Sequence, residues 1–190
     1  MRGWRASVLF AVALVVAPSG LAWGQDSEAP KPLVVTAENL MQGDARHQEY
    51  EARGGDPDAM LPGDVVRYQL QFTNLTSDSV RQVVFQNEVP AGLEYVPASA
   101  GADRGDVTVE YSIDAGATYA ATPMAETVID GQTVLRPAPP ETYTHIRWTL
   151  SGWLQPQAEL TAEYRARLPG DRGDEQPTSP AADTAEDIGA

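Results

Sequence analysis

The chain has 190 residues, and its 27 acidic against 13 basic side chains give a net charge of −14 at pH 7. Such a surface repels nucleic acid and anionic lipid, because phosphate binding needs Lys and Arg, so the charge excludes a nucleic-acid-binding protein. The sequence contains no Cys, which excludes a disulfide framework and leaves a hydrophobic core as the source of stability.

The first 24 residues have the pattern of a secretory signal peptide. Arg2 and Arg5 supply a positive start, and residues 6–17 are apolar without a charge. This apolar run is too short to cross a bilayer, which needs about 20 residues. Small residues at Ala22 and Gly24 favour cleavage after one of them, with an uncleaved anchor as the alternative. We therefore expect export to the periplasm or the extracellular space, without membrane insertion after cleavage.

The rest of the chain divides into one domain with polar flanks. Residues 25–31 form a short polar leader. Residues 169–190 are rich in Asp, Glu, Ala and Pro and have almost nothing apolar to bury, which predicts a disordered acidic tail. Residues 32–168 remain as a single domain, and no stretch in it is long and apolar enough to span a membrane.

Four segments alternate apolar and polar residues with a period of two. They are residues 66–73, 106–113, 146–150 and 160–168. This period places every second side chain on the same face of a strand, so each segment predicts a strand with one buried and one solvated face. The large side chains on the predicted buried rows include Tyr68, Phe72, Trp148 and Tyr164.

Turn-forming residues separate these segments. Pro62-Gly63-Asp64 precedes the first long strand, and Val89-Pro90-Ala91-Gly92 has Pro and Gly where a type I turn favours them. Asp130-Gly131 lies between two β-branched runs and predicts a hairpin, because both turn residues tolerate positive φ. Residues 43–52 could form a turn or two of helix. This pattern predicts an all-β protein with an immunoglobulin-like antiparallel β-sandwich.

Three stretches resemble a known family of surface domains. They are Pro62-Gly63-Asp64-Val65-Val66-Arg67-Tyr68, Val89-Pro90-Ala91-Gly92-Leu93-Glu94-Tyr95, and Trp148-Thr149-Leu150 with the strand at 160–168. The family is the conserved repeat domain of bacterial and archaeal surface proteins, a domain of unknown function that is number eleven in its series. The resemblance covers residues 32–168 and implies an immunoglobulin-like sandwich, export, and a structural or adhesive role without catalytic residues. The chain differs in having one copy and no cell-wall sorting signal, which favours a soluble periplasmic or released protein.

A second resemblance concerns one predicted loop. Ser112, Asp114, Gly116, Thr118 and Tyr119 have the spacing of the Asp-box hairpin, which is structural in sialidases and other propellers. In such a loop the Asp accepts backbone N–H bonds across the turn, the Gly takes positive φ and the aromatic ring packs beneath. We expect a structural role here, with carbohydrate or cation binding as the alternative.

Other residue types with chemical potential lack the spacing that a site requires. His47 and His145 have no companion motif for a zinc site or a hydrolytic triad, so we expect neither an enzyme nor a cofactor. The acidic residues between 49 and 58 lack the spaced Asp/Asn loop of a calcium motif, and we expect a solvated loop, with cation binding as the alternative. The two Arg-Gly-Asp triplets, at 104–106 and 172–174, are expected to be coincidental.

The sequence therefore favours an exported, non-catalytic structural or protein-interaction module of the bacterial cell envelope, which could engage a partner through sheet edges. The alternative is a carbohydrate- or calcium-binding accessory domain, so the expected partner is an envelope protein or a glycan. Trp153 lies just past a strand end and, if exposed, is the best contact residue, since aromatic side chains anchor interfaces. Trp153, Asp114 and Tyr119 are the predicted contact residues.

Overall fold

The computed structural model describes residues 32–170, and strands dominate this part of the chain. In chain order its elements are β1 (Leu33–Asn39), α1 (Ala45–Ala52), β2 (Val65–Thr73), β3 (Val80–Arg81), β4 (Val84–Glu88), β5 (Glu94–Tyr95), β6 (Gly101–Ala102), β7 (Val107–Ser112), β8 (Met124–Ile129), β9 (Gln132–Pro137), the 3₁₀ helix η1 (Pro140–Thr142), β10 (His145–Leu150), β11 (Trp153–Leu154) and β12 (Glu159–Arg167).

The predicted signal peptide (1–24), the predicted leader (25–31) and all but the first two residues of the predicted tail (169–190) lie outside the described residues. Within residues 32–170, no helix has the length and the apolar character needed to cross a membrane.

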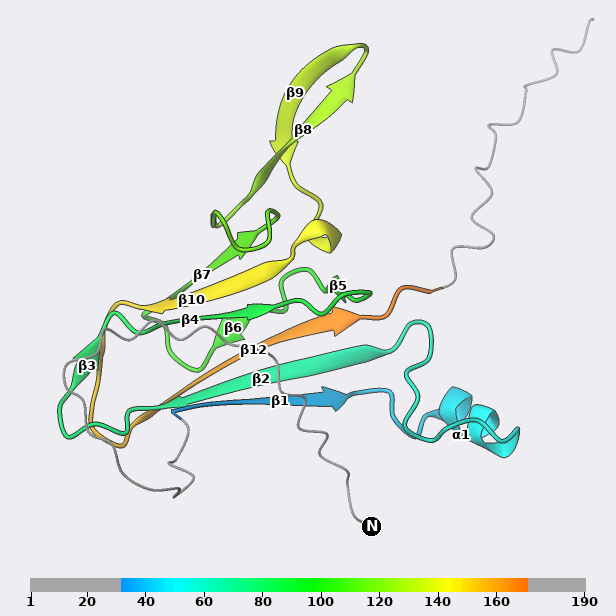
Figure 1. Cartoon of the computed structure of the whole chain (residues 1–190), viewed down its shortest axis with the longest axis horizontal. Coiled ribbons are helices and arrows are strands. Elements are labelled where there is room, and N and C mark those ends of the chain that lie inside the picture. Colours follow the sequence, from blue (N-terminus) through cyan, green and yellow to red (C-terminus); the bar gives the residue numbers. More distant parts are fainter. Residues whose placement is uncertain (1–31, 171–190) are drawn as a thin grey trace, which may run out of the picture.

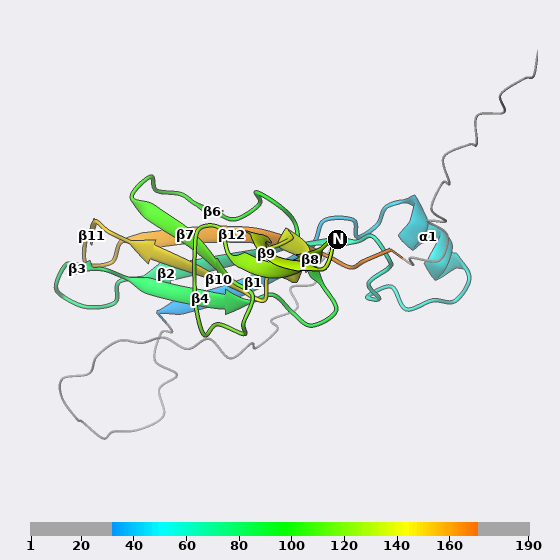
Figure 2. The same ribbon diagram turned by 90° about the horizontal axis from the view of Figure 1, so that it is seen from above.

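The strands form two facing antiparallel sheets (Figure 1), which overlap when they are viewed from above (Figure 2). The larger sheet has the strand order β1-β2-β12-β5, with β6 also pairing on β12, and the smaller sheet has the order β4-β10-β7. Two further two-stranded ribbons are β3 with β11, at one end of the sandwich, and β8 with β9, which projects from it (Figure 1). The described part of the chain is therefore an all-β sandwich.

The pairing of β2 with β12 places the apolar residues of the two alternating segments on one face of the larger sheet. Tyr68 lies opposite Tyr164, and Leu70 lies opposite Ala162, so the apolar rows of both strands face the same side of the sheet. All four side chains are buried. The rings of Tyr68 and Tyr164 stack with their centres 4.9 Å apart. The buried rows predicted on these two strands are confirmed.

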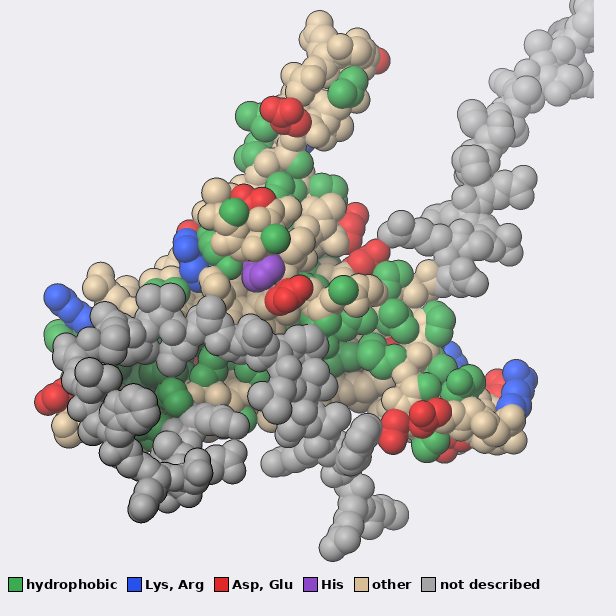
Figure 3. All heavy atoms as spheres, in the orientation of Figure 1, with side chains coloured by type: hydrophobic (Ala, Val, Ile, Leu, Met, Phe, Trp, Pro, Cys, Tyr) green, Lys and Arg blue, Asp and Glu red, His purple; other side chains and the backbone are tan. Residues whose placement is uncertain are grey.

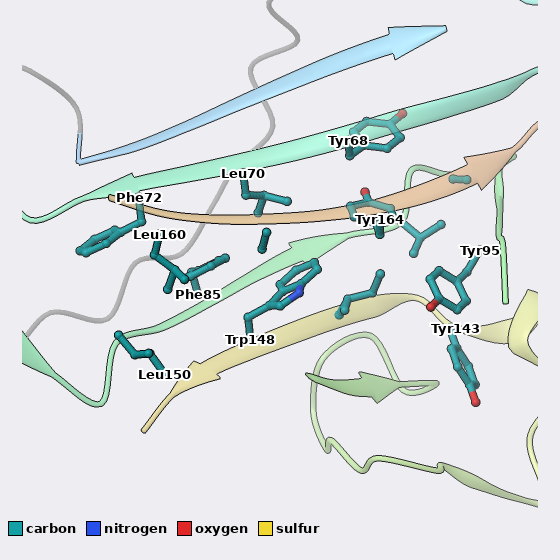
Figure 4. Packing of buried hydrophobic residues seen from close by; sticks show 14 of the residues in the cluster. Tyr68, Leu70, Phe72, Phe85, Tyr95, Tyr143, Trp148, Leu150, Leu160 and Tyr164 are labelled. Atoms are coloured by element: carbon teal, nitrogen blue, oxygen red, sulfur yellow. The ribbon is translucent and has the colours of Figure 1, made fainter. Parts of the chain in front are cut away.

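Trp148 packs between the smaller and the larger sheet and contacts both. Its side chain on β10 is completely buried, and its ring centre lies 5.7 Å from that of Phe85 on β4 and 6.1 Å from that of Tyr164 on β12. Figure 4 shows these rings between the ribbons of the two sheets. The indole Nε1 donates a hydrogen bond to the carbonyl of Gly101 at 3.1 Å. One side chain therefore connects β10 to three other strands, β4, β12 and β6.

The hydroxyl of Tyr164 is the polar centre of this core. It accepts a hydrogen bond from Asn87 Nδ2 at 2.7 Å and donates one to the carbonyl of Glu88 at 3.0 Å. Asn87 is itself buried. A buried polar group costs free energy unless it is paired, and this hydroxyl is paired both as an acceptor and as a donor. The two hydrogen bonds link the two sheets.

Replacing Tyr164 by phenylalanine is expected to lower the free energy of unfolding by about 1–3 kcal/mol, because Asn87 loses an acceptor without access to water. Urea unfolding monitored by tryptophan fluorescence measures the change. The matched control is Tyr50→Phe on α1, where the ring is exposed, and we expect a change within about 0.5 kcal/mol. Equal effects of the two substitutions would contradict this assignment.

One turn differs from its prediction. The hydrogen-bonded turn after β4 starts at Pro90, whose carbonyl accepts from the N–H of Leu93 at 3.0 Å, and not at Val89. Gly92 has a φ of +86°, so it occupies the third position of a turn that requires positive φ there. The glycine, not the proline, determines the position of this turn.

Candidate functional site

The β8–β9 hairpin carries the two most exposed large hydrophobic side chains among residues 32–170. Asp130 (φ +50°) and Gly131 (φ +77°) form its two-residue turn, as the sequence predicts. The hairpin extends away from both sheets (Figure 1), and hydrophobic side chains lie at its surface (Figure 3). Val128 is 69% exposed and Leu135 is 65% exposed. The sequence predicted the hairpin itself but not its projection from the sandwich.

The exposed apolar residues of the hairpin share one face. Val128 lies opposite Thr133, Leu135 lies opposite Glu126, and the exposed Met124 lies opposite Pro137. Residues directly opposite each other in an antiparallel pair are on the same side, so Met124, Val128 and Leu135 form one row. Within residues 32–170 each strand of the hairpin pairs only with the other. Both outer edges are therefore open to a further strand.

The predicted contact residue Asp114 is engaged within its own loop. Its Oδ1 accepts from Ser112 Oγ at 2.6 Å and from the Thr118 N–H at 2.9 Å, and its Oδ2 accepts from Thr118 Oγ1 at 2.5 Å. These hydrogen bonds, that of Ser112 first, lower the pKa of Asp114 to about 2. Gly116 takes a φ of +82°. The loop thus has the internal geometry that the Asp-box spacing predicts.

Tyr119 lies at the end of this loop, and its side chain packs on the outer face of the smaller sheet. Its hydroxyl donates to Gln86 Oε1 of β4 at 2.8 Å, and its ring centre lies 4.3 Å from the guanidinium carbon of Arg147 on β10. Arg147 Nη2 lies 2.8 Å from Glu110 Oε2 on β7. Tyr119 therefore attaches the loop to β4 and β10, and these contacts of its ring and hydroxyl are internal ones.

Trp153 is exposed, as the sequence allowed, at the end of the sandwich opposite α1. Its side chain is 55% exposed on β11, and the guanidinium carbon of Arg81 on β3 lies 5.4 Å from its ring centre. Its carbonyl accepts from Arg104 Nη1 at 3.2 Å. Arg104 also forms a bidentate ion pair with Asp106, in which Nε lies 2.9 Å from Oδ1 and Nη2 lies 2.6 Å from Oδ2. The charged groups of this Arg-Gly-Asp triplet thus pair with each other, and the second triplet lies outside the described residues.

His47 has no companion motif in the local sequence, but the fold brings two carboxylates to its ring. His47 is buried, with Asp44 and Asp64 within 3.0 Å of its two ring nitrogens. Asp64 is 17 residues away in the sequence, so local spacing gave no signal of this cluster. His145 lies on the outer face of β10, and its Nδ1 is 3.2 Å from Thr144 Oγ1.

The acidic residues between 49 and 58, the alternative cation site, come shortly after His47 in the sequence. Glu49 pairs with Arg53 on α1, and Asp56 Oδ1 accepts from the N–H of Asp58 at 2.9 Å. Among residues 32–170 there is no group of three or more His, Cys, Asp or Glu side chains that could hold a metal ion.

Comparison with known proteins identifies no family for this chain. No family model matches it, and no curated protein matches it. Among solved structures, the pilus backbone RrgB from Streptococcus pneumoniae is similar at 14% identity over 72% of this chain, with a TM-score of 0.28. The match spans 45% of the pilus protein, so this chain corresponds to less than half of that structure.

Proposed function

We propose that this chain is an exported, non-catalytic, immunoglobulin-like module of the bacterial cell envelope, and that it binds an extended strand of a protein partner along the β8–β9 hairpin. The supporting observation is the projecting ribbon, which has two open edges and a row of exposed apolar side chains. A two-stranded ribbon in water is marginally stable at best, and a third strand would stabilise it. Strand addition uses the free backbone groups for affinity and the side-chain row for specificity.

The charge of the hairpin supports a partner that is recognised by shape and apolar contact. The charged residues among 124–137 are Glu126, Asp130 and Arg136, whereas the whole chain has a net charge of −14. Exposed Val128 and Leu135 can bury apolar surface against a partner strand, and each such side chain can contribute about 1.5–3 kcal/mol. One basic and two acidic side chains give the hairpin a net charge of −1, so it repels acidic groups of a partner less than the chain as a whole does.

The other predicted contact residues support the hairpin as the main site. The carboxylate of Asp114 and the hydroxyl of Tyr119 already have partners within the domain. Trp153 is the remaining exposed aromatic anchor, and its place beside Arg81 suits a second, smaller contact. A partner that spans both places would have to reach along the length of the smaller sheet.

The test is capture of a partner from an envelope extract with the immobilised chain from Gln25 to Ala190, which contains every described residue. The double variant Val128→Thr/Leu135→Thr places a β-branched side chain, which favours strands, at both positions and removes apolar surface. We expect at least a tenfold weaker binding of the captured protein, since the loss of about 1.4 kcal/mol corresponds to a factor of ten. Affinity is measured with the purified partner by calorimetry.

Val34→Thr is the matched control, because Val34 is also exposed but lies on β1 of the larger sheet. It should retain the partner like the parent chain. Equal binding by the parent and the double variant would overturn the hairpin as the site. Hydrolase turnover by the purified chain that is lost in His145→Ala would overturn the non-catalytic assignment.

A further inference from the structure

The connection between β1 and β2 folds onto one end of the sandwich and contains α1 (Figure 1). The helix starts at Asp44, whose side chain caps it by accepting from the N–H of His47 at 3.0 Å. His47 is the buried residue of α1, with 1% of its surface exposed. A histidine in this position is the point at which the helix attaches to the rest of the domain.

Each ring nitrogen of His47 faces a carboxylate. Nδ1 lies 3.0 Å from Asp44 Oδ1, and Nε2 lies 2.9 Å from Asp64 Oδ2, whose residue is completely buried. The Nε2–H is not aligned for a good hydrogen bond, so its attraction to Asp64 is mainly between the charges. A neutral imidazole would turn one nitrogen lone pair toward a carboxylate oxygen. The arrangement therefore requires the doubly protonated ring.

Asp64 belongs to the sandwich and not to the helix. Its Oδ2 accepts from Asn39 Nδ2 at 2.7 Å, at the end of β1, and from the N–H of Leu61 at 3.0 Å. Its backbone carbonyl accepts from the N–H of Leu168, just past β12, at 2.8 Å. The carboxylate is thus held by groups outside α1 as well as by His47.

We propose that His47 is a proton-operated latch that holds α1 against the end of the sandwich. The charged groups that face it are Asp44 and Arg46 at the start of α1 and Asp64 before β2, and Arg46 Nη2 lies 2.9 Å from Asp64 Oδ1. Charged residues of neighbouring elements are directed elsewhere: Arg53 pairs with Glu49, and Arg167 on β12 pairs with Glu94. Two positive and two negative groups balance in the latch only while His47 carries its proton.

The direction of the pH dependence follows from this balance. The hydrogen bond to Asp44, together with the charges of Asp64 and Asp44, raises the pKa of His47 above its usual value of 6.5 despite desolvation. Because the pKa of His47 is higher in the folded protein than in the unfolded chain, the protonated ring stabilises the docked helix fully at pH values below the unfolded-state pKa. This stabilisation is lost as the pH rises through the folded-state pKa. The pKa of Asp44 is well below its usual range, so Asp44 stays charged throughout this window.

Amide hydrogen exchange of the chain from Gln25 to Ala190 tests the latch between pH 5 and pH 9, with rates corrected for the intrinsic effect of pH. We expect the protection of the α1 amides to fall as the pH rises above about 6.5, while the amides of β2 and β12 stay protected. Each unit by which the His47 pKa is raised gives a tenfold loss of protection. The same samples give the pKa of His47 from its ring-proton shifts.

His47→Gln is the comparison variant, because its side-chain amide can still donate hydrogen bonds and cannot be charged. Its α1 amides should exchange at the same corrected rate at every pH and at least as fast as those of the parent at pH 9. Constant α1 protection in the parent chain, or a ring-proton midpoint at or below 6.5, would overturn the proposal. These readouts need no binding partner, so they are independent of the hairpin hypothesis.

Discussion

Replacing Trp148 by alanine is expected to lower the free energy of unfolding by about 3–5 kcal/mol. The side chain is completely buried between the two sheets and contacts the rings of Phe85 and Tyr164. Its removal loses the transfer free energy of the indole and leaves a cavity that two paired sheets cannot close. The orphaned carbonyl of Gly101 adds to the loss. Guanidinium unfolding followed by far-ultraviolet circular dichroism measures the change.

Trp153→Ala supplies an internal control with the same chemical change. Trp153 is 55% exposed at the end of the sandwich, where water can fill the space left by its ring. We expect its substitution to change the free energy of unfolding by less than about 1 kcal/mol. A loss from Trp148→Ala no larger than that from Trp153→Ala would show that the sheets do not pack through Trp148.

The prediction of the core from the sequence depended on a single physical regularity. Apolar residues that recur with a period of two, such as Tyr68 and Leu70, or Tyr164 and Ala166, lie on one side of a strand and are buried together on that side. A shift in register by one residue would expose the whole row, so the pattern determines both the strand and the side that it buries. The Asp-box loop was equally accessible to sequence analysis, because its hydrogen bonds join residues within four positions of one another.

The remaining features depend on distance in the sequence or on the surroundings of an element. The β8–β9 hairpin has a strong local turn signal, but whether it lies on a sheet or projects from it depends on packing with other strands. The His47 latch joins Asp44, which is local, to Asp64, which meets the histidine only after α1 has folded back to the start of β2. No local spacing rule relates a helix to a carboxylate 17 positions later.

Replacing Asp64 by asparagine at pH 6 is expected to lower the free energy of unfolding by about 3–5 kcal/mol, which is the usual cost of removing one partner of a buried ion pair. The two side chains have nearly the same shape, so the substitution leaves the packing intact but removes the negative charge and one of the two acceptor oxygens. His47 and Arg46 then remain beside a neutral amide, and the amide can accept through one oxygen where the carboxylate accepts through two. Urea unfolding at fixed pH measures the loss.

Glu38→Gln is the matched control, because it neutralises an exposed carboxylate that pairs with Arg67 across β1 and β2. A surface pair of this kind contributes about 0–1 kcal/mol. Repeating both measurements at pH 9 separates charge from shape: the cost of Asp64→Asn should shrink once His47 has lost its proton, and the cost of Glu38→Gln should not change. If the cost of Asp64→Asn is the same at both pH values, Asp64 acts through Asn39, Leu61 and Arg46, and the charge on His47 does not contribute to stability.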